Sequence, residues 1–282
     1  MGTRGPAPSS CVYVDGEWSS QPDASVPAHD RGFLFGDGVF ESLRTRGGAP
    51  VRLHAHLERL AAGAAELGIE HVPDPARIEA VVHEALERAG TPDAYVRVTV
   101  TRGAAGGFDP SDAGDPRLVV SVAELTTPRA AAGVTLALLP PGPVPEHPPP
   151  HVKATGAFLR HTIGRRRARQ AGYDDGVWRD ADANVTEATS SNVFAVFGRL
   201  VRTPPEEVCL PGVTRADVLA AARAAGLATS TAPLATADLL DADEVFLTSS
   251  VAGVVAARRV AGVDLEPGPV TRRLAAEIEA IV

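Results

Sequence analysis

The chain contains almost no lysine. Lysine and arginine together number 27 in 282 residues, yet Lys153 is the only lysine. Arginine can replace lysine wherever a surface needs positive charge, but its guanidinium keeps its proton at neutral pH and cannot act as an amine nucleophile. Composition alone does not decide between two explanations: Lys153 remains by chance, or it is retained because its amine has a chemical role.

Other scarcities exclude whole classes of protein. Two cysteines far apart, Cys11 and Cys209, cannot make a disulfide framework, so a cytoplasmic location fits best. No apolar run is long enough to span a bilayer. A net charge of −8 argues against a nucleic-acid partner, and the one basic cluster, at 165–169, is typical of a solvated helix face. His54 and His56 have no suitably spaced third ligand, so we expect no metal site.

Proline is concentrated in one stretch. Residues 140–150 read PPGPVPEHPPP, and prolines disfavour both helices and sheet ladders. We therefore expect an interdomain linker at 140–151, between an N-terminal domain over 1–139 and a C-terminal domain over 152–282. The chain is 44% hydrophobic and 22% charged, which is ordinary globular composition, and it is long enough for two such domains.

Hydrophobic periodicity predicts an α/β chain in which helices and strands alternate. Apolar residues recur at helical spacing over 54–69, and Gly68 stands near the end of that stretch. Asp15 and Gly16 are typical of a hairpin turn. The expected elements are a hairpin at 11–18; strands at 39–46, 51–53, 94–102, 117–124, 134–139, 175–180, 192–197 and 244–249; and helices at 54–69, 75–89, 157–171 and 213–226, with a last one capped near Thr271.

Lys153 stands just after the proline-rich stretch, among Val152, Ala154 and Gly156. We expect a lysine at such a boundary to be partly removed from water. It would lose its proton more readily and could form a Schiff base with a carbonyl group.

Glu187 is the one acidic residue in the segment NVTEATSSNVF, at 184–194. If its carboxylate is buried, it needs a cationic partner. A protonated pyridine nitrogen would be such a partner, and this pairing makes a pyridoxal ring an electron sink. The alternative, which the segment alone favours, is an exposed glutamate in a turn.

Two further segments could bind an anion. LPGVTR, at 210–215, predicts a helix that starts at Val213 and Thr214, where backbone N–H groups and the Thr214 hydroxyl could bind a phosphate. A plain Thr N-cap explains this segment as well. Arg59 lies close to the apolar side of the predicted helix at 54–69, where it would need an anion; the alternative is a snorkelling side chain.

The order and spacing of the motifs are more specific than any one of them. The motifs are HDRGFLFGDGVFESLR (29–44), HLERL (56–60), Lys153, TEATSSNVF (186–194), Thr203-Pro204, LPGVTR and FLTSS (246–250). Together they resemble the class IV aminotransferase family, the fold-type IV pyridoxal-phosphate enzymes. Its members include branched-chain and D-amino acid aminotransferases and 4-amino-4-deoxychorismate lyase. The resemblance runs from about residue 10 to the C-terminus. It implies a smaller N-terminal α/β domain, a larger C-terminal domain with a barrel-like sheet, pyridoxal 5′-phosphate as cofactor, and a homodimer.

The resemblance also implies a role for individual residues. Lys153 would form the internal aldimine and then move a proton between substrate Cα and cofactor C4′, while Glu187 would pair with the pyridine nitrogen. The other expected cofactor-binding residues are Arg59, Asn192, Val213, Thr214, Ser249 and Ser250, of which Asn192 closes the strand beside the cofactor. The expected substrate-binding residues are Phe35, Phe40, Tyr95, Arg97 and Val251.

Some positions depart from individual subfamilies. Phe158 stands where many family aminotransferases place a tyrosine that hydrogen-bonds the cofactor phenolate. Gly107 stands where D-specific and lyase members carry a substrate-binding arginine, and Asp109 where D-amino acid enzymes have histidine. Gly107 and Asp109 weaken the assignment to the D-amino acid and lyase subfamilies. Phe158 does not, because the lyase and some D-amino acid members also carry an apolar residue there.

The branched-chain subfamily matches better, but not completely. Tyr95 and Arg97 fall on one face of a predicted strand, where branched-chain enzymes hold the substrate α-carboxylate. Ser42 and Phe35, however, replace a glycine and a tyrosine of that subfamily.

We therefore expect a pyridoxal-phosphate-dependent aminotransferase that moves an amino group between an amino acid and a 2-keto acid by a ping-pong mechanism. The first alternative is the lyase, which converts aminodeoxychorismate to 4-aminobenzoate and pyruvate. The second is a D-amino acid aminotransferase. A non-catalytic cofactor-binding protein is disfavoured because both Lys153 and Glu187 are present.

Overall fold

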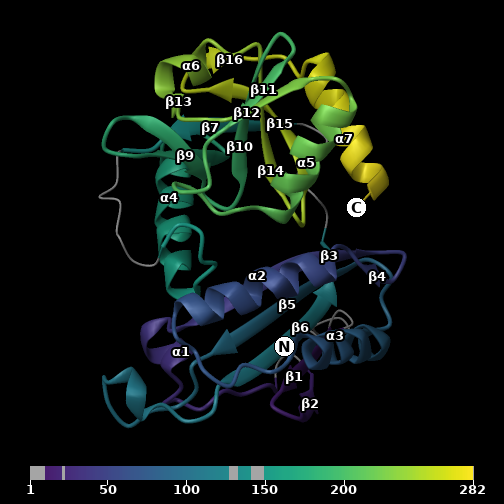
Figure 1. Ribbon diagram of the computed structural model, residues 1–282, viewed down its shortest axis with the longest axis vertical. Helices are drawn as coiled ribbons and strands as arrows, with labels where there is room; N and C mark the ends of the chain where they lie inside the picture. Colours follow the sequence, from purple (N-terminus) through teal and green to yellow (C-terminus); the bar gives the residue numbers. More distant parts are fainter. Residues whose placement is uncertain (1–9, 21–22, 127–132, 141–148, 282) are drawn as a thin grey trace, which may run out of the picture. The chain divides into compact units, whose positions relative to one another are not determined.

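The computed structural model describes residues 10–20, 23–126, 133–140 and 149–281, which form two compact units (Figure 1). The first unit runs over Met1–Thr127 and takes up Val152–Gly156. The second unit comprises Pro128–His151 and Ala157–Val282. Each unit has its own sheet and its own hydrophobic core.

The first unit is a six-stranded sheet in the order β2-β1-β6-β5-β3-β4, with helices packed on one face (Figure 1). All of its strand pairs are antiparallel. Its strands are β1 (Ser10–Val14), β2 (Glu17–Ser19), β3 (Gly38–Arg46), β4 (Ala49–Pro50), β5 (Ala94–Thr101) and β6 (Arg117–Glu124). Its helices are α1 (Arg31–Phe35), α2 (Leu53–Glu66), α3 (Pro75–Ala89) and the 3-10 turn η1 (Pro110–Asp112).

The alternation of β5 explains how this sheet divides its side chains. Val96, Val98 and Val100 are fully buried and belong to the core with α2 and α3. Tyr95 and Arg97 point to the opposite face because successive side chains of a strand alternate. The prediction that Tyr95 and Arg97 share one strand face is therefore confirmed.

The second unit is a ten-stranded mixed sheet that curls into a half-barrel (Figure 1). Its order is β12-β11-β10-β14-β15-β7-β8-β9-β13, and β16 pairs with β15. The strands are β7 (Val134–Leu138), β8 (Asp175–Arg179), β9 (Asn184–Ala188), β10 (Asn192–Phe197), β11 (Leu200–Thr203), β12 (Ala228–Thr231), β13 (Leu234–Ala235), β14 (Glu244–Ser249), β15 (Gly253–Val260) and β16 (Val263–Asp264). The helices are α4 (Phe158–Gln170), α5 (Val213–Ala224), α6 (Thr236–Leu240) and α7 (Pro269–Ile281). The 3-10 turn η3 (Thr155–Ala157) precedes α4.

The α/β class and most of the expected elements are confirmed, but the strand expected at 51–53 is wrong. Two glycines with positive φ, Gly47 and Gly48, close a tight hairpin, so the returning strand β4 is already complete at Pro50. Arg52 then adopts a left-handed conformation, and α2 begins at Leu53.

The last helix is capped near Thr271, as expected. α7 begins at Pro269, and the carboxylate of Glu244 accepts hydrogen bonds from the backbone N–H groups of Val270 and Thr271. The cap therefore lies at Thr271, and the side chain of Glu244 on β14 provides it. The carboxylate at this position satisfies N–H groups that the helix itself leaves without partners.

The two compact units do not coincide with the expected domains. β7 belongs to the second unit, while Val152–Gly156, which includes Lys153, belongs to the first. Of the expected linker at 140–151, residues 141–148 lie outside the described residues. The domains at 1–139 and 152–282 stay a prediction.

Among the residues that the structure describes, no helix has the length and apolar character needed to cross a membrane.

Candidate active site

Lys153 is held by the backbone of β3 in the first unit. Its carbonyl accepts a hydrogen bond from the Phe40 N–H at 3.0 Å, and the neighbouring Ala154 pairs with Val39 in an antiparallel bridge. Val152 and Ala154, on either side, are buried in the core of this unit. The main chain at Lys153 is therefore fixed, and the lysine Nζ lies 4.6 Å from the centre of the Phe40 ring.

The same ring is in contact with a second cation. The guanidinium carbon of Arg97 lies 3.9 Å from the centre of the buried Phe40 ring. In the sheet register Arg97 is directly opposite Ser42, whose hydroxyl lies 2.9 Å from the Tyr95 hydroxyl. Of the expected substrate-binding residues, the structure thus brings Phe40, Tyr95 and Arg97 together on one face of β3 and β5, and it places Lys153 against Phe40.

Phe35 has different neighbours. It ends the short helix α1 and is 45% exposed, with its ring centre 5.7 Å from that of Phe108. The guanidinium carbon of Arg31 lies 4.9 Å from the Phe35 ring. The substrate-binding role of Phe35 stays a prediction.

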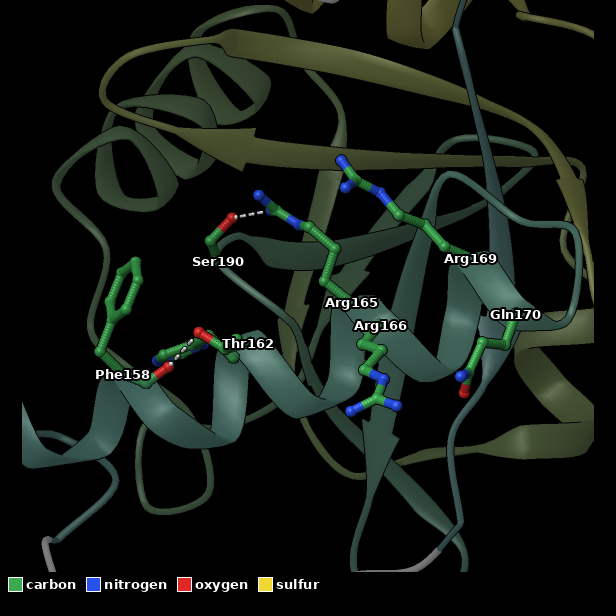
Figure 2. Close-up of a pocket in the computed structure, with 8 residues that line it drawn as sticks. Phe158, Thr162, Arg165, Arg166, Arg169, Gln170 and Ser190 are labelled. Atoms are coloured by element: carbon green, nitrogen blue, oxygen red, sulfur yellow. Dashed lines mark hydrogen bonds between the residues drawn. The ribbon is translucent and has the colours of Figure 1, made fainter.

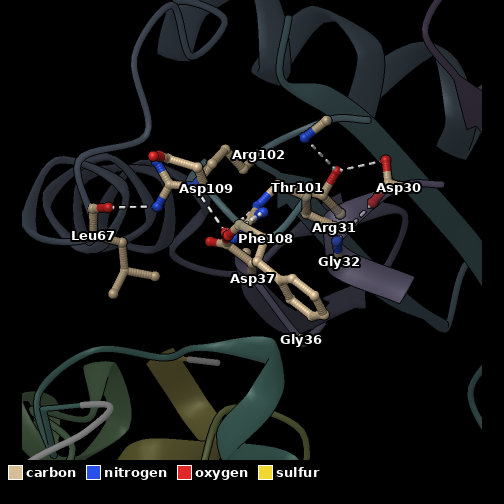
Figure 3. A network of polar contacts seen from close by, with 12 residues as sticks. Asp30, Arg31, Gly32, Gly36, Asp37, Leu67, Thr101, Arg102, Phe108 and Asp109 are labelled. Carbon is tan, nitrogen blue, oxygen red and sulfur yellow. Dashed lines mark hydrogen bonds and ion pairs between the residues drawn. The ribbon is translucent and has the colours of Figure 1, made fainter. Parts of the chain in front are cut away.

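An ionic network anchors the loop that carries Gly107 and Phe108 (Figure 3). Arg31 and Arg102 each donate from Nε to the same oxygen of Asp37 at 2.8 Å. Arg31 Nη1 also donates to the backbone carbonyls of Gly107 and Phe108, at 3.3 and 3.1 Å. Burial would raise the pKa of Asp37, but hydrogen bonds from the two guanidinium groups outweigh it and lower that pKa.

Sequence reasoning missed this network. The available signal was a pair of opposite charges, Arg31 and Asp37, inside an apolar and glycine-rich motif. The loop they anchor lies more than 70 residues further along the chain, and no local pattern indicates that distance.

Arg59 binds a carboxylate inside the first unit. Its Nε and Nη2 donate to the two oxygens of Glu41, both at 2.7 Å, and His56 Nδ1 lies 2.7 Å from the same carboxylate. Burial raises the pKa of Glu41, but the hydrogen bonds from His56 and Arg59 outweigh it and lower the pKa to about 2. The prediction that Arg59 needs an anion is confirmed, and the snorkelling alternative is wrong because only 12% of its side chain is exposed. Its contact with a cofactor phosphate stays a prediction.

Glu187 is buried in β9, so the alternative of an exposed turn glutamate is wrong. Its carboxylate accepts a hydrogen bond from the Leu210 N–H at 3.2 Å. The Leu210 carbonyl in turn accepts a hydrogen bond from Asn192 Nδ2 at 2.7 Å. One peptide segment therefore holds both Glu187 and Asn192, two of the expected cofactor-binding residues.

The start of α5 provides donors for an anion. Gly212 is the N-cap and offers no side chain, so the alternative of a Thr N-cap is wrong. A Cβ atom at Gly212 would come within 2.1 Å of Asn192 Oδ1, so the close approach of this loop requires glycine. Thr214, in the first turn, is buried, and its hydroxyl lies 3.5 Å from the hydroxyl of Ser250. The N–H groups at a helix start and paired hydroxyls are the donors that phosphate prefers.

Ser249 and Val251 flank Ser250 in the turn after β14. Ser249 Oγ accepts a hydrogen bond from the Ala252 N–H at 3.2 Å, which closes this turn. Val251 is half-buried in the same turn. The geometry places both beside Ser250, and their ligand contacts stay predictions.

Two residues beside Glu187 were not predicted. Arg160, on α4, lies over the Trp178 ring at 4.7 Å; burial lowers its pKa, while the charge of Glu187 acts in the opposite direction. Cys209 is fully buried, and burial, reinforced by the charge of Glu187, raises the pKa of its thiol to about 12. A buried thiol with a raised pKa is a poor nucleophile, so Cys209 has no assigned role in the chemistry.

Each unit by itself carries groups that suit one part of a phosphorylated pyridine aldehyde. The first unit supplies one lysine amine next to an arginine suited to a carboxylate, Lys153 and Arg97. The second supplies a buried carboxylate, Glu187, and a helix start with the hydroxyls of Thr214 and Ser250. An amine for the aldehyde, an acid for the pyridine nitrogen and donors for the phosphate are the three things such a cofactor requires.

Comparison with known proteins points the same way. The family model for Amino-transferase class IV matches residues 38–260. The chain is 30% identical to a putative branched-chain-amino-acid aminotransferase of Methanocaldococcus jannaschii, over 93% of each chain. It is also 30% identical to the aminodeoxychorismate lyase of Bacillus subtilis, over 86% of this chain and 84% of the lyase. The crystal structure of the T.th. branched-chain amino acid aminotransferase, complexed with N-(5′-phosphopyridoxyl)-L-glutamate, superposes with a TM-score of 0.88 at 25% identity, over 96% of this chain and 93% of that one.

Proposed function

Since the chain belongs to the class IV aminotransferases, a family of pyridoxal 5′-phosphate enzymes, we propose that it transfers an amino group between an amino acid and a 2-keto acid. The observation that carries this proposal is the group around Phe40. A lysine amine and an arginine guanidinium both lie against one buried ring, so a covalent anchor and a carboxylate-binding cation share one neighbour.

Each residue has a defined task in this proposal. When bound, pyridoxal 5′-phosphate supplies an electron sink for negative charge at the substrate Cα. Lys153 Nζ removes the proton from Cα and returns a proton later, acting as base and acid in turn. Glu187 holds a negative charge against the pyridine nitrogen, and the Leu210 N–H keeps that carboxylate in place. Thr214 and Ser250 bind the phosphate.

Arg97 is the residue that selects amino acids over other amines. Its guanidinium can donate two parallel hydrogen bonds to an α-carboxylate, and the Tyr95 hydroxyl stands on the same strand face. Contact with Phe40 limits how the guanidinium can turn. Two successive substrates, donor and acceptor, would use this one carboxylate site, which is the requirement of a ping-pong mechanism.

A lyase is the second candidate, and one observation favours it. Phe158 is 48% exposed at the start of α4 and has no hydroxyl, although many family aminotransferases have a tyrosine there. The B. subtilis relative, at 30% identity, is named an aminodeoxychorismate lyase. On this alternative Lys153 would move the same proton, and the products would be 4-aminobenzoate and pyruvate.

A single-turnover experiment tests the proposal. The cofactor-loaded protein is mixed with a panel of L- and D-amino acids, and the absorbance is followed for conversion of the cofactor to its amine form. We expect conversion by amino acids of one handedness. The conversion should be at least about tenfold slower in Arg97→Lys, because the lysine ammonium group is a point charge and cannot make the two parallel hydrogen bonds of the planar guanidinium. Absence of conversion with every amino acid, together with pyruvate release from aminodeoxychorismate, would reject the aminotransferase in favour of the lyase.

Assembly and location complete the proposal. We propose a homodimer, as the family resemblance implies, supported by apolar side chains that the first unit leaves exposed, Phe33, Leu34 and Phe108. Light scattering at about the monomer mass would contradict it. We also propose a cytoplasmic location, which is consistent with the two free, buried thiols, Cys11 and Cys209.

A further inference from the structure

A pocket of about 480 Å³ lies along α4 in the second unit (Figure 2). Its lining includes the guanidinium groups of Arg165, Arg166 and Arg169, the hydroxyl of Ser190 and the ring of Phe158. Phe158 stands at a position that contacts the cofactor in many family aminotransferases, whereas Arg165, Arg166, Arg169 and Ser190 lie outside the set that we assign to the cofactor. The solvated face expected at 165–169 is found for the exposed Arg166 and Arg169, but Arg165 is partly buried, and all three line a concave surface.

The charge of α4 is opposite to that of the chain. The helix carries five arginines and no acidic residue, whereas the whole chain has a net charge of −8. Among the residues that the structure describes, no carboxylate lines the pocket. Two other long helices show a different pattern: Arg88 on α3 and Arg273 on α7 each pair with a glutamate four residues away.

One arginine of the pocket is already fixed in position. Arg165 Nη2 donates to Ser190 Oγ at 2.6 Å and lies 3.3 Å from a carboxylate oxygen of Asp175, which is buried. In Figure 2 the Arg165 side chain reaches toward Ser190, and Arg169 extends on the same side of the helix. Within the described ranges, neither Arg166 nor Arg169 has a carboxylate within salt-bridge distance. The pocket therefore has an excess of positive charge.

The helix dipole explains only part of this arrangement. It favours cations in the last turn of α4, so it accounts for the exposed Arg167 as well as for Arg169. It does not require a cavity, and it does not require Arg165 to be held by Ser190.

We propose that this pocket binds a small molecule that carries two or more negative charges on its phosphate oxygens. Guanidinium groups donate paired hydrogen bonds to phosphate oxygens, and the Ser190 hydroxyl adds a further polar group. The volume lies in the range of small-molecule sites. Phe158, about half exposed, offers an apolar surface for the remainder of the ligand. The proposal goes beyond the proposed function and does not depend on it.

Calorimetric titration of the cofactor-saturated protein tests the proposal. Inorganic pyrophosphate is titrated at constant ionic strength, followed by ADP and by adenosine as a ligand without phosphate. We expect saturable binding of pyrophosphate with a Kd below about 1 mM, no binding of adenosine, and unchanged absorbance of the bound cofactor. Tighter binding of ADP than of pyrophosphate would indicate a nucleotide with its base against Phe158; equal affinities would indicate recognition of the phosphates alone.

Two variants locate the site. Arg166→Gln combined with Arg169→Gln should weaken pyrophosphate binding at least about tenfold. Arg167→Gln is the control, because it removes the same charge from the same helix outside the pocket, and it should change the Kd less than about twofold.

Four results would overturn the proposal. These are the absence of saturable binding, an equal loss of affinity in Arg167→Gln, citrate binding as tightly as pyrophosphate, and displacement of the cofactor by pyrophosphate. The last result would place the anion at the cofactor's own phosphate site.

Discussion

The Nζ atom of Lys153 lies 4.6 Å from the centre of the Phe40 ring, and the Phe40 N–H donates to the Lys153 carbonyl at 3.0 Å. The lysine is thus fixed twice by the same residue, through its backbone and through its side chain. An electron-rich ring attracts an ammonium group without accepting its proton. Phe40 can therefore orient the amine and leave it able to react.

Replacing the Phe40 ring should lower activity without unfolding the protein. In Phe40→Leu, Lys153 and Arg97 both lose their contact with an aromatic face, and we expect kcat/KM to fall about tenfold. Phe40→Tyr, the matched control, retains the ring and should stay within about threefold of the parent. Equal activity of Phe40→Leu and the parent, measured on a substrate found in the panel above, would show that the ring does not position these cations.

Acid should destabilise the first unit through Glu41. The pKa of this carboxyl is lowered to about 2 in the folded protein, from an ordinary value of 4.5. The stabilisation is therefore complete above about pH 4.5 and is lost as the pH falls from there toward 2, by at most about 3 kcal/mol. Urea unfolding at several pH values measures this loss.

Two substitutions separate Glu41 from the other carboxylates. Glu41→Gln should flatten the dependence of the unfolding free energy on pH in that window. Glu124→Gln, at an exposed position, should leave it unchanged. An unaltered pH dependence in Glu41→Gln would show that its ionisation is not coupled to folding.

Arg31 should hold the loop that contains Gly107 and Phe108. Arg31→Met removes both loop contacts and leaves Asp37 with Arg102 alone, which should cost about 3 kcal/mol because the ion pair is largely buried. Arg259→Met, which breaks an exposed pair with Asp264, should cost less than about 1 kcal/mol. Hydrogen exchange should accelerate at the loop amides in the first variant only; unchanged exchange there would remove the anchoring role.

Gly212 should be needed for the geometry at the start of α5. The Cβ of Gly212→Ala would approach Asn192 Oδ1 to 2.1 Å, so the loop or the asparagine must move. We expect cofactor affinity to fall on the order of tenfold or more. Gly106→Ala is the matched control, because its Cβ would meet nothing within 4 Å, and it should bind the cofactor normally. Normal affinity in Gly212→Ala would argue against a phosphate at this helix start.

Local patterns predicted those parts of the fold that depend on periodicity and capping. The helix at 75–89 has Asp74 as its N-cap and Gly90 at its C-cap, and both ends were found where expected. β5 alternates with period two, so the face that carries Tyr95 and Arg97 followed directly. β9 was missed because Asn184 and Glu187 have weak strand propensity, and only pairing with β8 and β13 makes the segment a strand.

Partners far apart in the chain could not be predicted from the residues. Arg59 indicated that an anion was needed, but the identity of that anion, Glu41, depends on how α2 packs on β3. The burial of Glu187 likewise depends on the return of the chain at Leu210, 23 residues later. Such contacts depend on tertiary packing, and the spacing of hydrophobic residues along the sequence predicts only secondary structure.

Covalent labelling of Lys153 tests the central claim most directly. Lys153 holds the only side-chain amine of this chain, so a cofactor bound covalently to a side-chain amine can be bound at one position only. The cofactor-loaded protein is reduced with borohydride, digested and analysed by mass spectrometry, with Lys153→Arg treated in parallel. The account predicts the added cofactor mass on the peptide that contains Lys153 and no label in the variant. A parent protein without label, or label on any other peptide, would contradict it.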